Sequence, residues 1–369
     1  MKILYDQQIF SFQEYGGISR YFYELVSRIK KTNYEVSIDG KFSNNVYLTK
    51  LKKNTIKFLP GFNFPYKNIL LFYLNIFFGD RYLSINNFDL LHTTYYQPYF
   101  LNKLKGRPYV ITVYDMIHEL YAKNYEDLDN RTLEYKKKTI LNANQIISIS
   151  ENTKKDLIKL YGVPKDKVKV IYLGNPLEGA QPLKVNNLPD KYILFVGNRS
   201  GYKNFTFFVN AVAPILKEDK KLFLVCAGGG GFSAEANSLL AKLKIADQVK
   251  HINFKNDNEL AYIYKNAFVY ILPSLYEGFG MTALEAFSMG CPVVASGTSS
   301  IPEVCGEAVI YINPKSSDSI REAILKVLSD EKIREKLIKL GIAQVKKFTW
   351  QKTVKETLEV YEKVIKSYN

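Results

Sequence analysis

Short apolar runs alternate along this chain with longer segments in which apolar residues recur at helical spacing. Apolar residues at positions 22, 25, 26 and 29 predict one face of a helix, and Ser19 is its expected N-cap. A later helix over 152–161 should end at Gly162 and Pro164. The runs that we expect to form strands in the first half are 2–5, 35–38, 109–113 and 145–149. This alternation predicts an α/β fold with a parallel sheet covered on both faces.

The same pattern restarts after a segment of low periodicity. Residues 175–190 hold three prolines and one glycine, and we interpret them as a linker between two domains, 1–184 and 185–351. Beyond it the expected strands are 192–196, 222–227, 269–272 and 292–295, with a helix over 282–289. The chain therefore predicts a second parallel α/β domain.

Composition agrees with two globular domains. The 369 residues are 47% hydrophobic and 24% charged, which excludes disordered and collagen-like chains. The three cysteines lack CxxC spacing, so neither a zinc cluster nor a disulfide framework is expected. Asp6 stands where a signal peptide needs its apolar stretch. We expect a cytoplasmic protein, which could lie at the inner face of the cytoplasmic membrane.

The charge is strongly positive, and more so in the first half. Residues 1–187 carry 27 Lys and Arg against 17 Asp and Glu, so +10 of the net +15 lies there. Such a balance suits an anionic membrane surface, nucleotide phosphates or nucleic acid, and equally a solvated lysine-rich surface. The most apolar stretch, 69–78, is far short of the ~20 residues that cross a bilayer. It predicts a core helix, or a face that dips into a membrane surface beside Lys50, Lys52, Lys53, Lys57 and Lys67.

The strongest chemical motif runs from Glu277 to Glu285, between a predicted buried strand and a helix. Gly278 and Gly280 let the backbone approach a ligand closely, and the first N–H groups of the helix can bind a diphosphate. The two carboxylates flank this position, where they would bind sugar or ribose hydroxyls. The alternative is a capped turn with two surface acids.

Two further loops follow predicted strands. Arg199 and Lys203 leave the first strand of the second domain, where open α/β sheets bind ligands, and their charges can stabilise a departing diphosphate. Gly16-Gly17 precedes a helix and could approach a phosphate, or form a plain tight turn. The run of four glycines at 228–231 is explained most simply as a turn at a strand exit, and the alternative is a direct contact with a ligand.

A third group follows the strand over 109–113. Asp115 and His118 lie three positions apart at its carboxyl end, within reach of a cleft, and His118 is one of only three histidines. His92 is a weaker candidate at another strand end. Asp127-Leu128-Asp129 has the form of a metal-binding triplet, but such triplets arise by chance in polar stretches, and we expect no metal site.

In their order and spacing these motifs resemble those of retaining nucleotide-sugar glycosyltransferases of family 4, the group 1 glycosyl transferases. The match includes Glu277 and Glu285, the turn with Arg199 and Lys203, and Gly16-Gly17, and it covers nearly the whole chain. Stretches 149–154, 301–304 and 348–350 also look family-like. The resemblance implies the GT-B architecture, with two facing Rossmann-like domains and a final helix, about 352–369, that packs back on the first.

The resemblance also implies roles for residues. The C-terminal domain would hold the sugar nucleotide, the N-terminal domain would take the acceptor, and neither a metal nor another cofactor would be needed. The residues with implied donor-binding roles are Gly16, Gly17, Gly278, Phe279, Gly280, Met281, Thr282 and Glu285. The expected catalytic residues are Arg199, Lys203, Glu277, Asp115 and His118.

One position departs from the family. Many relatives place a histidine directly before the aspartate, where this chain has Tyr114, so Tyr114, Asp115 and His118 all stay candidates for the reaction centre. The surrounding pattern is similar to mannosyltransferase-like enzymes of bacterial O-antigen and capsule assembly. That implies a hexosyl transfer, from GDP-mannose or else a UDP-sugar, to a glycan on a polyprenyl diphosphate or to a soluble acceptor.

Two other classes fit less well. A nucleotide-dependent oxidoreductase should show GxGxxG with an acid about 20 residues further on, and this chain does not. A basic nucleic-acid-binding module would leave Glu277 and Glu285 unexplained, because carboxylates repel phosphate backbones.

Overall fold

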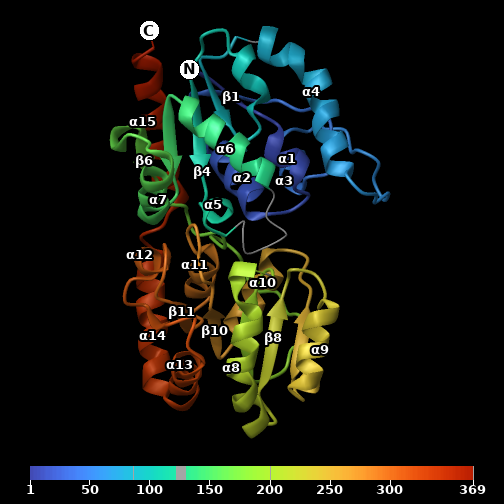
Figure 1. Cartoon of the computed structure of the whole chain (residues 1–369), viewed down its shortest axis with the longest axis vertical. Helices are drawn as coiled ribbons and strands as arrows, with labels where there is room; N and C mark the ends of the chain where they lie inside the picture. Colours follow the sequence, from blue (N-terminus) through green and yellow to red (C-terminus); the bar gives the residue numbers. More distant parts are fainter. Residues whose placement is uncertain (86, 122–129, 200, 369) are drawn as a thin grey trace. The chain divides into compact units, whose positions relative to one another are not determined.

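The computed structural model describes residues 1–85, 87–121, 130–199 and 201–368, and it divides into two compact units (Figure 1). The first unit comprises Met1–Leu173 and Trp350–Asn369, and the second comprises Gly174–Thr349. Each unit is built on a six-stranded sheet in which every paired strand runs parallel. The predicted α/β fold with parallel sheets is confirmed.

In the first unit the strand order is β2-β1-β3-β4-β5-β6. The strands are β1 (Lys2–Tyr5), β2 (Glu35–Ile38), β3 (Leu90–Thr93), β4 (Tyr109–Val113), β5 (Gln145–Ser148) and β6 (Val168–Val170). The helices are α1 (Gln8–Phe12), α2 (Gly17–Ile29), α3 (Val46–Leu51), α4 (Lys67–Ile85), α5 (Ile117–Tyr121), α6 (Asn130–Asn142), α7 (Glu151–Tyr161) and α15 (Trp350–Lys366), with short 3-10 turns η1 (Pro98–Lys103) and η2 (Lys165–Lys167).

In the second unit the order is β12-β11-β10-β7-β8-β9. The strands are β7 (Tyr192–Val196), β8 (Phe223–Ala227), β9 (Val249–Ile252), β10 (Val269–Leu272), β11 (Val293–Ser296) and β12 (Val309–Ile312). The helices are α8 (Phe205–Glu218), α9 (Ala234–Lys242), α10 (Asp257–Lys265), α11 (Met281–Ser288), α12 (Ile301–Cys305), α13 (Ser317–Ser329) and α14 (Glu331–Val345), with 3-10 turns η3 (Gly201–Lys203) and η4 (Ala246–Gln248).

The division between the units falls earlier than the expected junction at residues 184 and 185. Asn258 accepts hydrogen bonds from the backbone N–H of Gln181 and of Leu183, both at 2.9 Å. The N–H of Asn175 likewise donates to Phe348 O at 3.0 Å. The proline-rich segment therefore lies with the second unit, because its backbone is hydrogen-bonded to residues of that unit.

The prediction of Ser19 as the N-cap of the helix with apolar positions 22, 25, 26 and 29 was wrong. Helix α2 begins at Gly17, so Ser19 lies inside its first turn, and Ser19 Oγ donates to Gly16 O at 3.0 Å. The side chain of Gln13 serves the helix end instead, because its Oε1 accepts from the N–H of Ser19 at 3.3 Å. The helix expected over 152–161 is observed as α7, with Ser150 as N-cap and Gly162 in the left-handed conformation after its last turn.

Helix α15 completes the first unit. It packs on α2 and β5, and Trp350 and Tyr361 are fully buried there. The hydroxyl of Tyr361 lies 2.9 Å from that of Tyr5 on β1, and Thr353 Oγ1 donates to Tyr172 O at 2.7 Å. The last helix of the chain is thus hydrogen-bonded to its first strand. None of the helices in the described part of the chain is long and apolar enough to cross a membrane.

Candidate active site

Lys203 and Glu277 meet at the carboxyl edge of the second sheet. Lys203 ends the loop after β7, Glu277 lies in the loop after β10, and these two strands are parallel neighbours. Lys203 Nζ lies 2.7 Å from Glu277 Oε1, and Ser274 Oγ donates to the same oxygen at 2.6 Å. The side chains of Lys203 and Glu277 are only 21% and 11% exposed, so solvent screens this ion pair weakly.

The backbone around Glu277 is held by two serines. Glu277 N donates to Ser299 Oγ at 2.9 Å, and Ser300 Oγ donates to Glu277 O at 2.7 Å. Both serines follow β11, the strand on the other side of β10 from β7. The loop that carries Glu277 is therefore fixed from both neighbouring strands, and its carboxylate is positioned rather than solvated.

Helix α11 begins directly after this loop. Gly280 precedes it with φ of 98°, a left-handed conformation that favours glycine, and no side chain caps the helix. Met281 and Thr282 are half-buried in its first turn, after buried Phe279. Such an uncapped N-terminus is electropositive and suits an anion.

Glu285 lies one turn into α11 and is buried. Its Oε2 accepts a hydrogen bond from the hydroxyl of Tyr264 at 2.9 Å. Burial, and then the charge of Glu285, raise the pKa of Tyr264 well above its ordinary value, so this phenol stays a donor at neutral pH. Tyr264 was not foreseen in the sequence, because it belongs to a different helix, α10.

Arg199 is directed away from this cluster. Its guanidinium donates to the carbonyl oxygens of the four glycines at 228–231, among them Gly228 O at 2.8 Å and Gly231 O at 2.9 Å. It also lies 4.9 Å from the centre of the Phe232 ring. Partial burial lowers the pKa of Arg199, but a guanidinium remains charged at neutral pH. The structure therefore does not bring Arg199 and Lys203 onto one group.

The strand order explains this separation. Strand β7 lies between β10 and β8. From the loop after β7, Lys203 therefore contacts the loop after β10, and Arg199 contacts the loop after β8. The glycines after β8 allow the approach: a Cβ on Gly229 would lie 2.3 Å from Gly197 O. The four-glycine run is a strand exit that also presents its carbonyls to Arg199.

In the first unit, Gly16 lies against the side chain of Gln13, and Gly17 is the first residue of α2. A Cβ on Gly16 would lie 2.4 Å from Gln13 Oε1, and that oxygen already accepts from Ser19 N. Gly16 is extended, with φ of 175°, so a close approach rather than a strained backbone accounts for glycine here. An anion at this helix end would have to displace the Gln13 amide.

Asp115 and His118 lie on either side of the start of α5. Asp115 Oδ1 accepts from Ile117 N at 3.0 Å and so caps the helix, while His118 is half-buried within it. Beside them Lys136, fully buried, donates to Asp115 O at 2.6 Å and to Glu119 Oε2 at 2.9 Å. The backbone at Asp115 is therefore fixed by a buried cation that sequence reasoning missed.

Tyr114 is buried, and its hydroxyl donates to Thr94 O at 3.3 Å. Burial raises its pKa well above the ordinary value, which leaves the phenol protonated. Of Tyr114, Asp115 and His118, only the last two are partly open to solvent.

His92 occupies a different environment. It is fully buried and lies between the hydroxyls of Tyr361 and Thr112, with Nε2 2.9 Å from Thr112 Oγ1. Burial lowers the pKa of His92 to about 3. This histidine is a neutral part of the core between β3 and α15, which excludes it from proton transfer with a ligand.

The carboxyl end of β1 carries a further buried group, Asp6. It accepts from Thr94 N at 2.8 Å, Thr93 Oγ1 at 2.7 Å and Gln8 Nε2 at 2.7 Å. Burial raises its pKa, and these donors oppose that shift. The network joins residues up to 88 positions apart, so no local pattern could have indicated it.

Among the described residues, no three His, Cys, Asp or Glu side chains lie close enough together to hold a metal ion. Asp127-Leu128-Asp129 lies outside the described residues.

Comparison with known proteins gives two family models that divide the chain. Residues 15–178 match the model described as Glycosyltransferase Family 4, and residues 182–344 match Glycosyl transferases group 1. An uncharacterised glycosyltransferase of Methanocaldococcus jannaschii is 31% identical over 299 residues, 76% of each chain. The O-antigen chain mannosyltransferase B of Escherichia coli is 29% identical, over 60% of this chain and 61% of its own length.

Solved structures give the same architecture at lower identity. Sucrose-phosphate synthase from Thermosynechococcus elongatus has a TM-score of 0.81 at 21% identity, over the whole of both chains. HepE of Anabaena, in complex with UDP and glucose, has a TM-score of 0.74 at 16% identity, over 98% of this chain and 99% of its own. WaaG, a glycosyltransferase of lipopolysaccharide biosynthesis, has a TM-score of 0.73 at 15% identity, over 98% and 99%.

Proposed function

Because this chain belongs to the family 4 and group 1 glycosyltransferases of GT-B fold, we propose that it transfers a hexosyl group from a nucleotide diphosphate sugar to a glycan acceptor, with retention of configuration. The donor we favour is GDP-mannose, followed by a UDP-sugar. The acceptor we favour is a lipid-linked glycan of surface polysaccharide assembly, O-antigen or capsule. The E. coli relative supports mannose and O-antigen, and HepE supports a UDP nucleotide.

One observation carries this proposal: the Lys203–Glu277 pair stands beside the uncapped start of α11 at the carboxyl edge of the second sheet. A lysine and a helix N-terminus both bind phosphate oxygens. Glu277, positioned by Ser274, is suited to accept hydrogen bonds from the hydroxyls of the donor sugar. Glu285, further along the helix, is suited to a ribose.

For the chemical step we favour attack on the same face as the leaving group. In this reaction the bond from the sugar C1 to the phosphate oxygen breaks, the acceptor oxygen bonds to C1, and the leaving phosphate oxygen takes the acceptor's proton. The sugar passes through an oxocarbenium-like state, and no strong protein base is needed. Lys203 and α11 stabilise the charge that develops on the diphosphate.

A double displacement is the alternative, with Glu277 as the nucleophile. Glu277 Oε1 already accepts from both Lys203 and Ser274, and these two bonds reduce its nucleophilicity. We therefore assign Glu277 to donor binding rather than to a covalent intermediate.

Arg199 joins the diphosphate only after its side chain leaves the carbonyls of residues 228–231. A phosphate compensates that loss, because a guanidinium binds an anionic acceptor, often through two hydrogen bonds, more strongly than it binds neutral carbonyl oxygens. In this proposal the loop after β7 rearranges as the donor binds. We also propose that the protein is located in the cytoplasm. Its three cysteines are free and buried, which agrees with a reducing compartment.

The test is a thermal shift assay with UDP, GDP, dTDP, CMP, NAD and single-stranded DNA, in EDTA. A ligand at ~100 times its Kd adds about 2.7 kcal/mol to the free energy of unfolding, which corresponds to several degrees of Tm. We expect one nucleoside diphosphate to stand out and the EDTA to have no effect. A shift with NAD or DNA alone would contradict the proposal, and a shift that needs a divalent cation would contradict metal independence.

A second arm follows the product. With the matching nucleotide sugar, NMR should show the anomeric configuration of the donor kept in the glycoside. An inverted product would rule out both mechanisms above. Short soluble glycans and the same glycans on polyprenyl diphosphate distinguish the two acceptor classes, and we expect faster transfer to the lipid-linked form.

A further inference from the structure

One segment of the first unit combines a strong positive charge with exposed apolar side chains. Residues 40–79 contain six lysines and no aspartate or glutamate. This stretch spans α3, the loop that follows it and the first part of α4. In Figure 1 the chain between α3 and α4 extends outward from the rest of the unit.

Large apolar side chains are unusually open in this segment. Phe62, Tyr66, Tyr73 and Phe77 are 69%, 78%, 62% and 77% exposed. Other exposed apolar residues surround them, namely Ile56, Leu59, Phe64, Ile69, Leu70 and Phe78. Single exposed apolar residues are ordinary, but a concentration over one loop and one helix face indicates an interaction surface.

The fold holds this face outward. On its inner side α4 buries Leu71, Phe72 and Asn75. Asn75 Oδ1 accepts from Lys41 N at 3.0 Å and Phe42 N at 2.9 Å, and its Nδ2 donates to Phe42 O at 2.8 Å. A buried polar side chain with these bonds resists rotation of the helix, so the exposed side cannot turn into the core. The predicted core helix is therefore correct for one face of α4 only.

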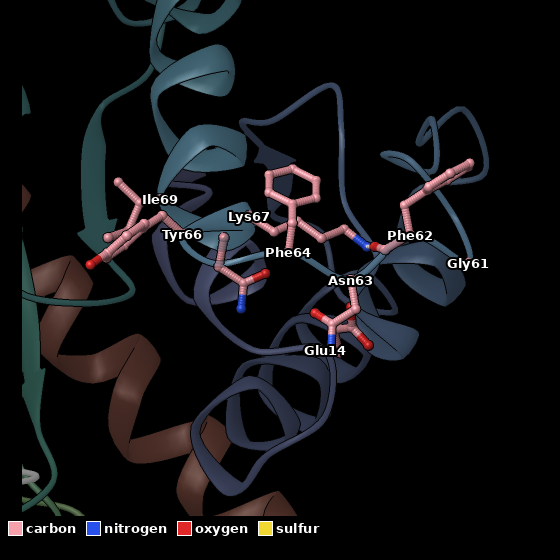
Figure 2. Close-up of a pocket in the computed structure, with 9 residues that line it drawn as sticks. Glu14, Gly61, Phe62, Asn63, Phe64, Tyr66, Lys67 and Ile69 are labelled. Carbon is pink, nitrogen blue, oxygen red and sulfur yellow. Dashed lines mark hydrogen bonds between the residues drawn. The ribbon is translucent and has the colours of Figure 1, made fainter.

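The lysines divide into two groups. Lys67 is buried, and its Nζ donates to Leu59 O at 3.1 Å and Phe62 O at 2.7 Å, which fixes the loop against the start of α4 (Figure 2). Lys52 likewise donates to Ile38 O at 3.1 Å and Gly40 O at 2.6 Å. The remaining four lysines are exposed, and they are Lys41, Lys50, Lys53 and Lys57.

The loop and the start of α4 line a cavity of about 470 Å³ (Figure 2). Phe62, Phe64 and Ile69 are among its lining residues, together with Glu14. A second cavity, of about 430 Å³, has Ile69 and Tyr73 in its lining and also contains Gln13, Gln97 and Arg131. The exposed apolar face thus continues directly into a pocket with polar groups.

We propose that this face, which we call the basic apolar face (residues 41–78), docks on the surface of an anionic lipid bilayer. Its four exposed lysines contact anionic headgroups, while Phe62, Tyr66, Tyr73 and Phe77 enter the interfacial region. Apolar burial and headgroup attraction act together, as membrane-surface helices require. This inference goes beyond the proposed function and does not depend on it.

Two other occupants fit the surface less well. A second copy of the chain would bring an acid-free, lysine-bearing face against itself, and like charges oppose that contact. The bases of single-stranded nucleic acid would stack on the aromatic rings, but they would leave exposed aliphatic side chains uncovered, namely Ile56, Leu59, Ile69 and Leu70. A bilayer accepts both the aliphatic and the aromatic side chains.

The test is cosedimentation of the full-length protein with vesicles. One set is phosphatidylcholine alone, and the other is equal parts phosphatidylcholine and phosphatidylglycerol. We expect strong binding to the anionic vesicles, weakened by salt, and little to the neutral ones. The partition coefficient onto anionic vesicles should fall about fivefold in each of the variants Lys50→Gln, Lys53→Gln and Lys57→Gln. This factor corresponds to about 1 kcal/mol of binding free energy per lysine. The combined F62S, Y66S, Y73S and F77S variant should lose most binding at every salt concentration.

Matched controls lie in the second unit. Lys217→Gln, Lys220→Gln and Lys221→Gln remove the same charge from exposed positions there, and Leu325→Ser with Ile342→Ser removes exposed apolar groups. These controls should keep vesicle binding. If they lose it equally, binding follows net charge and the basic apolar face is not the site. Equal binding to neutral vesicles, or none to anionic ones, also overturns the proposal.

Two further measurements identify a different occupant. A dimer in light scattering that becomes monomeric in the Ser variant would assign the face to a second copy, and loss of single-stranded DNA binding in that variant would assign it to nucleic acid. The nucleoside diphosphate shift is measured on the same proteins and should not change, because that site lies in the second unit. A failed docking test thus remains separate from a failed function test.

Discussion

Arg199 and Lys203 belong to one short loop, but their side chains contact different partners. The partner of each residue determines the expected effect of replacing that residue. Lys203 neutralises Glu277, whereas Arg199 is bonded to the carbonyls after β8. Neither arrangement belongs to the hydrophobic core of the second unit. We therefore expect the fold to tolerate alanine at either position.

We predict that Arg199→Ala and Lys203→Ala each lower turnover by ~10²–10³, because in the proposed reaction each substitution removes a charge that would stabilise the leaving diphosphate. The check is kcat with the matching donor, alongside Tm and circular dichroism. Near-normal turnover in both variants would remove the diphosphate assignment. Asn210→Ala, on the exposed side of α8, serves as the control and should keep full activity.

His92 gives a prediction about stability rather than activity. In the unfolded chain a histidine takes up a proton near pH 6.5, but burial holds the pKa of His92 at about 3. Between these two pH values the unfolded state binds more protons than the folded state. The contribution of His92 to the free energy of unfolding is thus complete above pH 6.5 and falls as the pH drops toward 3.

When the pH is lowered from about 8 to about 5.5, protonation of His92 in the unfolded chain should reduce the free energy of unfolding of the first unit by about 1.4 kcal/mol. His92→Gln cannot take up a proton, so its free energy of unfolding should fall by that much less over the same range. Urea unfolding of both proteins at the two pH values gives the difference directly. Parallel pH profiles for the two proteins would show that another group causes the acid sensitivity.

At the scale of single residues, the sequence predicted which kinds of side chain form the candidate site, but not which groups each of them contacts. Glu277 and Lys203 could be placed because each follows a recognisable apolar strand. Ser274, Tyr264 and Gln13 could not, since their roles depend on side-chain directions in loops and on neighbouring helices. Arg199 was expected on the diphosphate, yet in this structure its donors reach backbone oxygens.

At the scale of elements, the position of α11 depends on its contact with α14. Gly341 on α14 faces Phe287 on α11, and a Cβ there would lie 2.7 Å from Phe287 Cδ1 and 3.2 Å from its Cγ. The phenyl ring is buried and cannot move aside easily. A methyl group at this position would push α11, and with it the turn that contains Gly280.

We predict that Gly341→Ala destabilises the second unit and weakens nucleotide binding. Overpacking costs about 1–3 kcal/mol, and the helix preference of Ala over Gly returns about 1 kcal/mol of it. We expect a net loss of about 1 kcal/mol in urea unfolding and a raised Kd for the nucleoside diphosphate. Ile342→Ala, at the neighbouring exposed position, should change neither quantity. An unchanged Kd in Gly341→Ala would show that α11 does not shift.

Three of the strands that were not predicted share a physical property. Strands β6, β9 and β12 are three or four residues long and include partly or fully exposed positions, so their apolar runs are too short to stand out. Strands such as β4 and β10 are buried on both faces, and their continuous apolar sequences indicated them. For helix α4 the sequence left a core helix and a surface face as alternatives, because an apolar sequence does not say which side of a helix is covered.

At the scale of the whole molecule, the repetition of strand and helix was enough to predict two parallel sheets. It was not enough to place the division between the units, because hydrogen bonds such as those to Asn258 cannot be read from proline and glycine content. Nor could it reveal how tightly α15 is bound. That helix supplies Tyr361, whose hydroxyl contacts both His92 and Tyr5.

The bonding of α15 to β1 imposes an order on biosynthesis. Residues 1–173 leave the ribosome well before the helix that covers Tyr5, Tyr21 and His92, because the whole second unit lies between them in the sequence. The second unit, encoded between these parts, is complete before the first can close. Until α15 has been synthesised, the first unit leaves the apolar surface under this helix open, in addition to its basic apolar face, and chaperones or an early membrane encounter would have to protect both.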